Sequence, residues 1–402
     1  SLQIVKQAEN GLLESGAILS RYAVKFAGFR AWVETVQGDV ESGMKQAQEA
    51  VETATSMPES ETERPRLLGY AYNTLATVYW ALSDMETSGE YYRKALELAK
   101  QTGMRRDAAV TLGNIGLVLE GQGLWEDAIE AILQKMKTVR EIGEKYMVNS
   151  CHGELVPSLI RAGRMREARR HCDSYLRISR ELVSTHDITI GLGLDAHLAM
   201  WERDVERMRR SAGRLLKLAS EKGIRREEWK AYMYLGWAAL LAGDMAEAEK
   251  LIGKALEMSR DLDEKWLAPT MRGLLARAAV SADETRLEEL LSQAEADAED
   301  VLDIVLADCL HHFALAYADA GRTDEAEDML RRALGLYRDF SAQSNMAETG
   351  LELGRLLAEN GPDQHSEASE HLSAAAETFR RVGLPGRAEE AEGLAARCGG
   401  DS

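Results

Sequence analysis

The chain has 402 residues, four cysteines and a formal net charge of −18. Such acidity disfavours nucleic acid as a partner, because affinity for phosphates comes mainly from Lys and Arg. No apolar run reaches the roughly 18 to 20 residues of a membrane span, and no secretory signal is recognisable. The cysteines are far apart and form no C-x-x-C pair, so we expect a cytoplasmic protein without a membrane partner.

A turn motif of the form G-[DLR]-x-x-[DE]-A recurs along the chain. Its first residues are separated by 45, 40, 40, 40, 40, 40, 38 and 40 positions. The turn pairs are Gly38-Asp39, Ser83-Asp84, Gly123-Leu124, Gly163-Arg164, Arg203-Asp204, Gly243-Asp244, Asp283-Glu284, Gly321-Arg322 and Gly361-Pro362. A constant period in this range is typical of a solenoid whose units pack on their neighbours. Because helix formers dominate the composition, the sequence predicts a single all-α solenoid over residues 1–402.

In chain order, we expect an N-terminal helix in residues 1–23 and nine helix-turn-helix repeats in residues 24–382. A capping helix and a tail follow in residues 383–402. The polar stretch Met57–Pro65 accounts for the one 45-residue step, and we interpret it as an exposed loop.

Each repeat has the apolar pattern of two helices. In the sixth unit, Trp229, Leu235 and Gly236 recur on one helical face, and Ala248 lies on a second face after the turn. This arrangement, W-x-x-L-G-x-x-Y followed by small residues, resembles the tetratricopeptide repeat over about residues 24–382. The long repeats also resemble those of kinesin-light-chain-type proteins, and the sensor regions of STAND-class ATPases and of maltose-regulator-type transcription activators.

Several positions depart from the repeat. Pro157 lies inside a predicted first helix and is expected to kink or shorten it. Changes of pitch are expected around residues 150–215 and 280–305, where the pattern is weakest. A second landmark, suited to a helix C-terminal cap, follows the second helices. Its positions are Gly103, Gly143, Gly223, Asp263 and Gly383.

The resemblance implies that the first helices of the repeats line a concave groove. Aromatic and Met side chains at groove-facing positions offer large contact areas to a partner. The candidate binding residues are Trp32, Tyr70, Asn73, Trp80, His197, Met200, Trp201, Met233, Trp237, Arg277 and His311. Packing between adjacent helices is the alternative for each of them. Glycines at groove positions either leave room for a ligand or allow close helix packing; these are Gly28, Gly113, Gly153, Gly193 and Gly273.

The leading hypothesis is a scaffold that binds a protein or peptide in its groove. The alternative is a domain that senses a small-molecule effector and regulates a larger STAND-type ATPase, cyclase or transcriptional regulator. The first residue, Ser1 rather than Met, is compatible with such an excised sensor. No catalytic, metal-binding or cofactor-binding motif is recognisable, so we expect no enzyme activity, no metal and no cofactor. RNA binding along the basic stretch 161–230 is a further hypothesis, which the net charge disfavours. The oligomeric state is not predicted.

Overall fold

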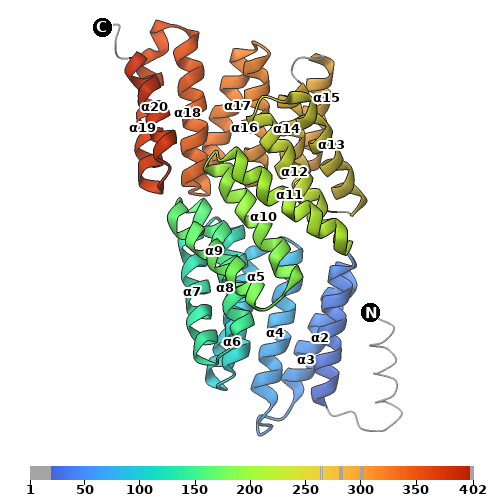
Figure 1. Cartoon of the computed structure of the whole chain (residues 1–402). Coiled ribbons are helices and arrows are strands. Elements are labelled where there is room, and N and C mark those ends of the chain that lie inside the picture. Colours follow the sequence, from blue (N-terminus) through green and yellow to red (C-terminus); the bar gives the residue numbers. More distant parts are fainter. Residues whose placement is uncertain (1–19, 263, 265, 280–283, 299–302, 399–402) are drawn as a thin grey trace. The chain divides into compact units, whose positions relative to one another are not determined.

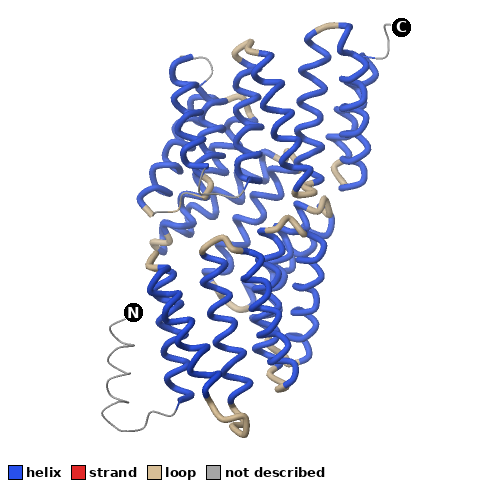
Figure 2. Tube along the Cα trace, turned by 180° about the vertical axis from the view of Figure 1, so that it is seen from behind, coloured by secondary structure: helices blue, strands red, loops and turns tan. Residues whose placement is uncertain are grey.

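The computed structural model describes residues 20–262, 264, 266–279, 284–298 and 303–398, and these residues form helices and no strand (Figure 2). The predicted all-α helical repeat fold is therefore confirmed. The helices, labelled in Figure 1, are α2 (Ser20–Val36), α3 (Val40–Ser56), α4 (Arg64–Ala81), α5 (Met85–Gln101), α6 (Arg105–Gly121), α7 (Trp125–Glu141), α8 (Lys145–Arg161), α9 (Met165–Glu181), α10 (Thr185–Trp201), α11 (Val205–Lys222), α12 (Arg225–Leu241), α13 (Met245–Asp261), α14 (Ala268–Ala279), α15 (Glu284–Ala298), α16 (Asp303–Asp319), α17 (Thr323–Asp339), α18 (Gln343–Asn360), the 3₁₀ helix η1 (Pro362–Gln364), α19 (His365–Val382) and α20 (Pro385–Cys398).

The helices follow the predicted repeats. Each even-numbered helix from α2 to α18, apart from α14, is joined to the next odd-numbered helix at one of the predicted turns; the predicted turn residue Asp283 after α14 lies outside the described residues. The expected loop is present, although Pro65 lies in the first turn of α4. The expected capping helix is α20. Of the N-terminal helix predicted in residues 1–23, residues 1–19 lie outside the described part of the chain. Ser20 is the first residue of α2.

Residues with a left-handed backbone conformation occur in the turns between the two helices of a repeat and also at the ends of second helices. The predicted cap glycines Gly103, Gly143, Gly223 and Gly383 all have positive φ, whereas Asp263 lies outside the described residues. Val183 and Ser341 take the same conformation at the equivalent place in other repeats, with φ of 53° and 50°. The sequence did not predict these two caps, because neither residue type favours this conformation. At these two positions the repeating helix geometry therefore outweighs the backbone preference of the residue itself.

The groove glycines allow close helix packing. A Cβ atom built on Gly28 would lie 2.5 Å from the Tyr70 ring, and one on Gly153 would lie 2.9 Å from the Tyr175 ring. Equivalent atoms on Gly113 and Gly273 would each lie 2.8 Å from a neighbouring side chain, and only the one on Gly193, at 3.7 Å, would fit. Four of the five glycines thus leave room for a side chain of a neighbouring helix. At these four positions the structure favours close helix packing over room for a ligand.

The described part of the chain comprises two compact units, unit 1 (Ser1–Cys151) and unit 2 (His152–Ser402). The division falls within α8, at the start of the stretch 150–215 where the repeat pattern weakens. Pro157 does not shorten α8, which keeps 17 residues. A single solenoid over residues 1–402 stays a prediction, since each unit is described by itself.

Unit 2 has contacts between repeats that are distant in sequence. The Ser344 hydroxyl at the start of α18 donates to the carbonyl oxygen of Ile160 in α8 at 3.1 Å. Gly163, in the turn after α8, lies against Val382 at the end of α19, and Gly383 lies against Arg166. The first and last repeats of unit 2 therefore meet, and the first helices between them surround a cavity.

Candidate binding cavity

A cavity with a volume of about 340 Å³ lies in unit 2. Its lining comes mostly from the first helices of successive repeats, α8, α10, α12, α14, α16 and α18. The lining residues are Pro157, Arg161, His197, Met200, Trp201, Arg203, Met233, Tyr234, Trp237, Trp266, Leu267, Thr270, Arg277, Asp308, His311, His312, Leu315, Tyr337, Asn345, Glu348 and Thr349. Such a size and such a mixture of aromatic and polar groups are typical of ligand pockets.

The structure brings together the candidate residues from the middle of the sequence. His197, Met200, Trp201, Met233, Trp237, Arg277 and His311 all line this one cavity. The N-terminal candidates belong to unit 1 and are arranged differently. Tyr70 and Asn73 line a separate cavity there, whereas Trp32 and Trp80 line neither cavity and have exposed fractions of 50% and 43%.

Asp308 on α16 is the centre of a polar network in the cavity wall. Arg161 donates from Nη2 to Oδ2 of Asp308 at 3.1 Å. The Tyr337 hydroxyl and the Asn345 amide donate to Oδ1 of Asp308 at 2.6 and 2.9 Å. Burial alone would lower the pKa of the Arg161 guanidinium, but the Asp308 carboxylate raises it. The network joins α8 to α16, α17 and α18.

A second ion cluster surrounds Glu348 on α18. Its carboxylate accepts hydrogen bonds from Arg203, in the turn after α10, and from Arg387 on α20 at 2.6 Å. Burial would raise the pKa of this carboxyl group, but Arg203 and Arg387 hold it well below its usual range. The cluster therefore fixes the end of α10 against α18 while leaving Glu348 charged at the cavity surface.

The aromatic side of the cavity keeps its histidines neutral. The indole Nε1 of Trp201 donates to Nε2 of His197 at 3.3 Å, and the Trp237 ring meets the His312 ring edge-on at 5.1 Å. Burial lowers the pKa of His197 to about 4 and that of His311 to about 4. Because both imidazoles are uncharged near neutral pH, they act as neutral hydrogen-bonding groups beside the tryptophans.

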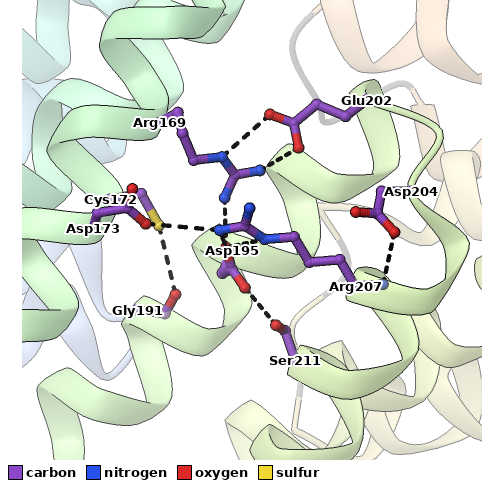
Figure 3. A network of polar contacts seen from close by, with 9 residues as sticks. All are labelled: Arg169, Cys172, Asp173, Gly191, Asp195, Glu202, Asp204, Arg207 and Ser211. Atoms are coloured by element: carbon purple, nitrogen blue, oxygen red, sulfur yellow. Dashed lines mark hydrogen bonds and ion pairs between the residues drawn. The ribbon is translucent and has the colours of Figure 1, made fainter.

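A polar network on another face of α10 holds that helix in place (Figure 3). Asp195 accepts from Arg169 on α9 and from Arg207 and Ser211 on α11. Burial would raise the pKa of Asp195, but these donors lower it. Asp195 and His197 are two residues apart, so they face nearly opposite directions on the helix. The network thus positions α10 from one side while His197 lines the cavity on the other.

The unit 1 cavity has a volume of about 300 Å³. Asn73 donates to the Thr111 hydroxyl at 2.9 Å and accepts from the Asn114 amide at 3.2 Å. Thr111 donates to the carbonyl oxygen of Asp107, and Tyr70 donates to that of Lys25 at 3.4 Å. Tyr70, Asn73 and Thr111 of this cavity are therefore all hydrogen-bonded within the protein.

Sequence reasoning missed several lining residues of the unit 2 cavity. Arg161, Asn345 and Tyr337 come from repeats far apart in sequence, and their meeting depends on the closure of unit 2, for which the repeat pattern has no signal. Thr270 and His312 are also in the wall. The periodic spacing of groove positions could have found His312, which neighbours the predicted His311.

The fold is a helical repeat that resembles tetratricopeptide-repeat proteins. Tetratricopeptide-repeat family models match residues 67–134 and 306–339, which confirms that resemblance. No curated protein matches the chain in sequence. In the described residues, no helix combines the length and apolar character that crossing a membrane requires.

Several solved structures share the fold at low sequence identity. One is a Rap protein complexed with Competence and Sporulation Factor (TM-score 0.55, 12% identity, covering 94% of this chain and 98% of that chain). Another is NprR in complex with its cognate peptide NprX (0.51, 12%, 94% and 98%). A third is aspartyl phosphate phosphatase F from Bacillus subtilis (0.51, 11%, 92% and 96%). At these identities the likeness shows the fold alone.

Proposed function

We propose that the protein is a receptor for a short peptide, which binds in the unit 2 cavity. The observation that carries the proposal is the cavity itself, where side chains of six first helices converge and tryptophans lie beside polar groups. Trp237 and Met233 offer apolar contact area, while the neighbouring charged groups can orient a peptide backbone. The peptide complex of NprR, a protein of similar fold, supports the choice of ligand class.

The proposal contains no catalytic step, and the absence of enzyme activity stays a prediction. The competing hypothesis is a small-molecule effector in the same cavity, which would make the chain the sensor of a larger regulator. Both hypotheses place the ligand in the same cavity. They differ only in whether that ligand is a peptide or a small molecule. The experiment must therefore offer both classes to the same protein.

The test is affinity selection from a pool of random tetrapeptides, with retained peptides identified by mass spectrometry and titrated by calorimetry. Replacing Trp237 by Ala should weaken binding of the retained peptides by at least about 30-fold, because a buried tryptophan anchor contributes about 2 kcal/mol or more. Tyr146→Ala is the matched control, since this aromatic side chain is 60% exposed and outside the cavity. Circular dichroism and thermal unfolding check that both variants fold.

The proposal fails if the pool contains no binding peptide, or if Trp237→Ala folds and binds the retained peptides as tightly as the original chain. Retention of small molecules alone from a metabolite mixture would support the effector hypothesis instead.

A further inference from the structure

The charges that line the unit 2 cavity do not balance. Three arginines line it, Arg161, Arg203 and Arg277, but only two carboxylates do, Asp308 and Glu348. The first two arginines have these carboxylates as partners. Arg277 is left over, and within the described residues no carboxylate forms an ion pair with it. One positive charge of the wall is therefore unmatched.

Among the described residues, no charged group forms a hydrogen bond with Arg277. Glu352, Asp319 and Glu348 attract its guanidinium through space, and Arg203 repels it. Burial and the repulsion by Arg203 together lower the pKa of Arg277. A half-buried cation without a contacting carboxylate lacks the interactions that offset its loss of hydration.

Three polar atoms in this part of the wall also lack a hydrogen-bond partner. They are Nε of Arg277, Oγ1 of Thr270 and Nδ1 of His312. Thr270 and His312 have exposed fractions of only 4% and 5%. Buried polar atoms are almost always bonded in native proteins, so these three atoms are hydrogen-bonding capacity that the described residues leave unused.

These atoms lie around one helix contact. Thr270, Gly273 and Arg277 are three and four residues apart on α14 and share one face. A Cβ atom on Gly273 would lie 2.8 Å from Cβ of His312, so the glycine allows α16 to pack closely at this point. The backbone thus brings His312 next to the α14 face that carries Thr270 and Arg277.

The rest of the wall is apolar near these groups. Trp237 meets His312 edge-on, and Met233 and Trp201 line the same cavity. A ligand that satisfies both parts of the wall has an acidic group and an apolar body.

We propose that the cavity recognises a ligand whose carboxylate pairs with the guanidinium of Arg277, while its apolar part lies against Trp237 and Met233. Thr270 and His312 supply further hydrogen bonds to the acidic end. This proposal rests on the function proposed above and names the chemical group that the receptor reads. The carboxylate belongs to a peptide C-terminus, to an acidic side chain or to a non-peptide aromatic acid, and the experiment distinguishes these sources.

The experiment compares acids with their amides. One tetrapeptide pool lacks Asp and Glu and has a free C-terminal carboxylate; a second is the same pool with a C-terminal amide; a third is the amide pool with one Glu. Indole-3-acetate and indole-3-acetamide form the non-peptide pair. Dissociation constants are measured by calorimetry on the whole chain.

The acid of at least one pair should bind at least about 10-fold more tightly than its amide, because a charge-assisted pair with arginine is replaced by a neutral contact. In Arg277→Gln the acid and the amide should bind about equally, which is the coupling expected of a direct pair. Arg277→Lys should keep part of the preference, since it retains the charge without the planar fork. Arg209→Gln, at an exposed arginine outside the cavity, is the matched control.

The outcomes separate the two proposals. If peptides bind and depend on Trp237, but acids and amides bind equally or their difference persists in Arg277→Gln, the carboxylate proposal is overturned and the peptide receptor stands. If only indole-3-acetate binds, in a manner that depends on Arg277, the carboxylate proposal stands and the peptide receptor falls. If no probe binds, both are overturned.

Discussion

The two cavities have similar volumes, about 340 Å³ in unit 2 and about 300 Å³ in unit 1, but their polar groups differ in pairing. In unit 1, Asn73, Thr111 and Asn114 bond to one another. In unit 2, Arg277, Thr270 and His312 each have a polar atom without a partner. The two cavities therefore differ in unmet hydrogen-bonding capacity rather than in volume, and this difference is the reason for placing the proposed ligand in unit 2.

The largest expected effect concerns the paired groups of unit 2. Replacing Asp308 by Ala leaves Arg161 buried without its carboxylate and removes the acceptor of Tyr337 and Asn345. We expect the free energy of unfolding to fall by about 3 kcal/mol, measured by urea unfolding. Asp328→Ala is the control, because its carboxylate is 71% exposed and its pairing with Arg332 contributes little. A loss no larger than that of the control would contradict the role of the network.

Acid should affect the two units differently, because all eight histidines lie in unit 2. His197 and His311 have pKa values of about 4 when folded and near 6.5 when unfolded, so the unfolded chain binds more protons between these values. Stability therefore falls as the pH falls from about 6.5 to about 4, by up to about 3 kcal/mol for each group. Thermal unfolding across this range measures the loss.

The double variant His197→Gln, His311→Gln should depend less steeply on pH, and each single variant should have an intermediate dependence. A slope for the double variant that equals the original one would show that these imidazoles do not carry the acid sensitivity.

A smaller effect is expected in unit 1. Asn73→Ala removes a donor to Thr111 and an acceptor of Asn114, so the free energy of unfolding should fall by about 1 to 2 kcal/mol in urea. Replacing both partners in Asn73→Leu, Thr111→Val should cost less than the sum of the single substitutions, because neither partner of the Asn73–Thr111 hydrogen bond is then left without the other. If the two costs simply add, the side chains of Asn73 and Thr111 are not coupled by a hydrogen bond that contributes to stability.

The smallest effect has the opposite sign. Arg277→Met removes an unmatched charge, so we expect stability to stay equal or to rise by up to about 1 kcal/mol. Arg161→Met, the same substitution at the paired arginine of the cavity, should lower stability. Melting temperatures of the two variants give the comparison, and equal losses would mean that Arg277 is as well paired as Arg161.

The sequence was sufficient for the local features of the fold. The turn period placed the helix pairs whose turns the structure describes, and Gly103, Gly143, Gly223 and Gly383 were recognised as left-handed caps because glycine adopts positive φ without strain. Val183 and Ser341 were missed, since their conformation is imposed by tertiary packing. Groove positions for His197, Trp237 and Arg277 followed from the resemblance to tetratricopeptide repeats. Whether these residues bind a ligand stays a proposal.

What the sequence could not predict depends on contacts over long distances. The Arg161–Asp308 pair and the Ser344–Ile160 bond join residues that no period relates. A pattern of neighbours predicts which side chains face a groove, but not that the groove closes. For the same reason the sequence did not distinguish Trp32 and Trp80, which are exposed, from Trp237, which lines the cavity.

The contact between Ser344 and Ile160 also has a consequence for the order of events during synthesis. Repeats of a solenoid can fold one after another as they leave the ribosome, because each needs only its neighbour. The unit 2 cavity is different, since its wall includes residues from Pro157 to Thr349. It is complete only when the last repeats have been made and have met the first ones. The site of the proposed ligand therefore forms only after α18 has been made, and a nascent or truncated product that ends before α18 would consist of folded repeats without this cavity.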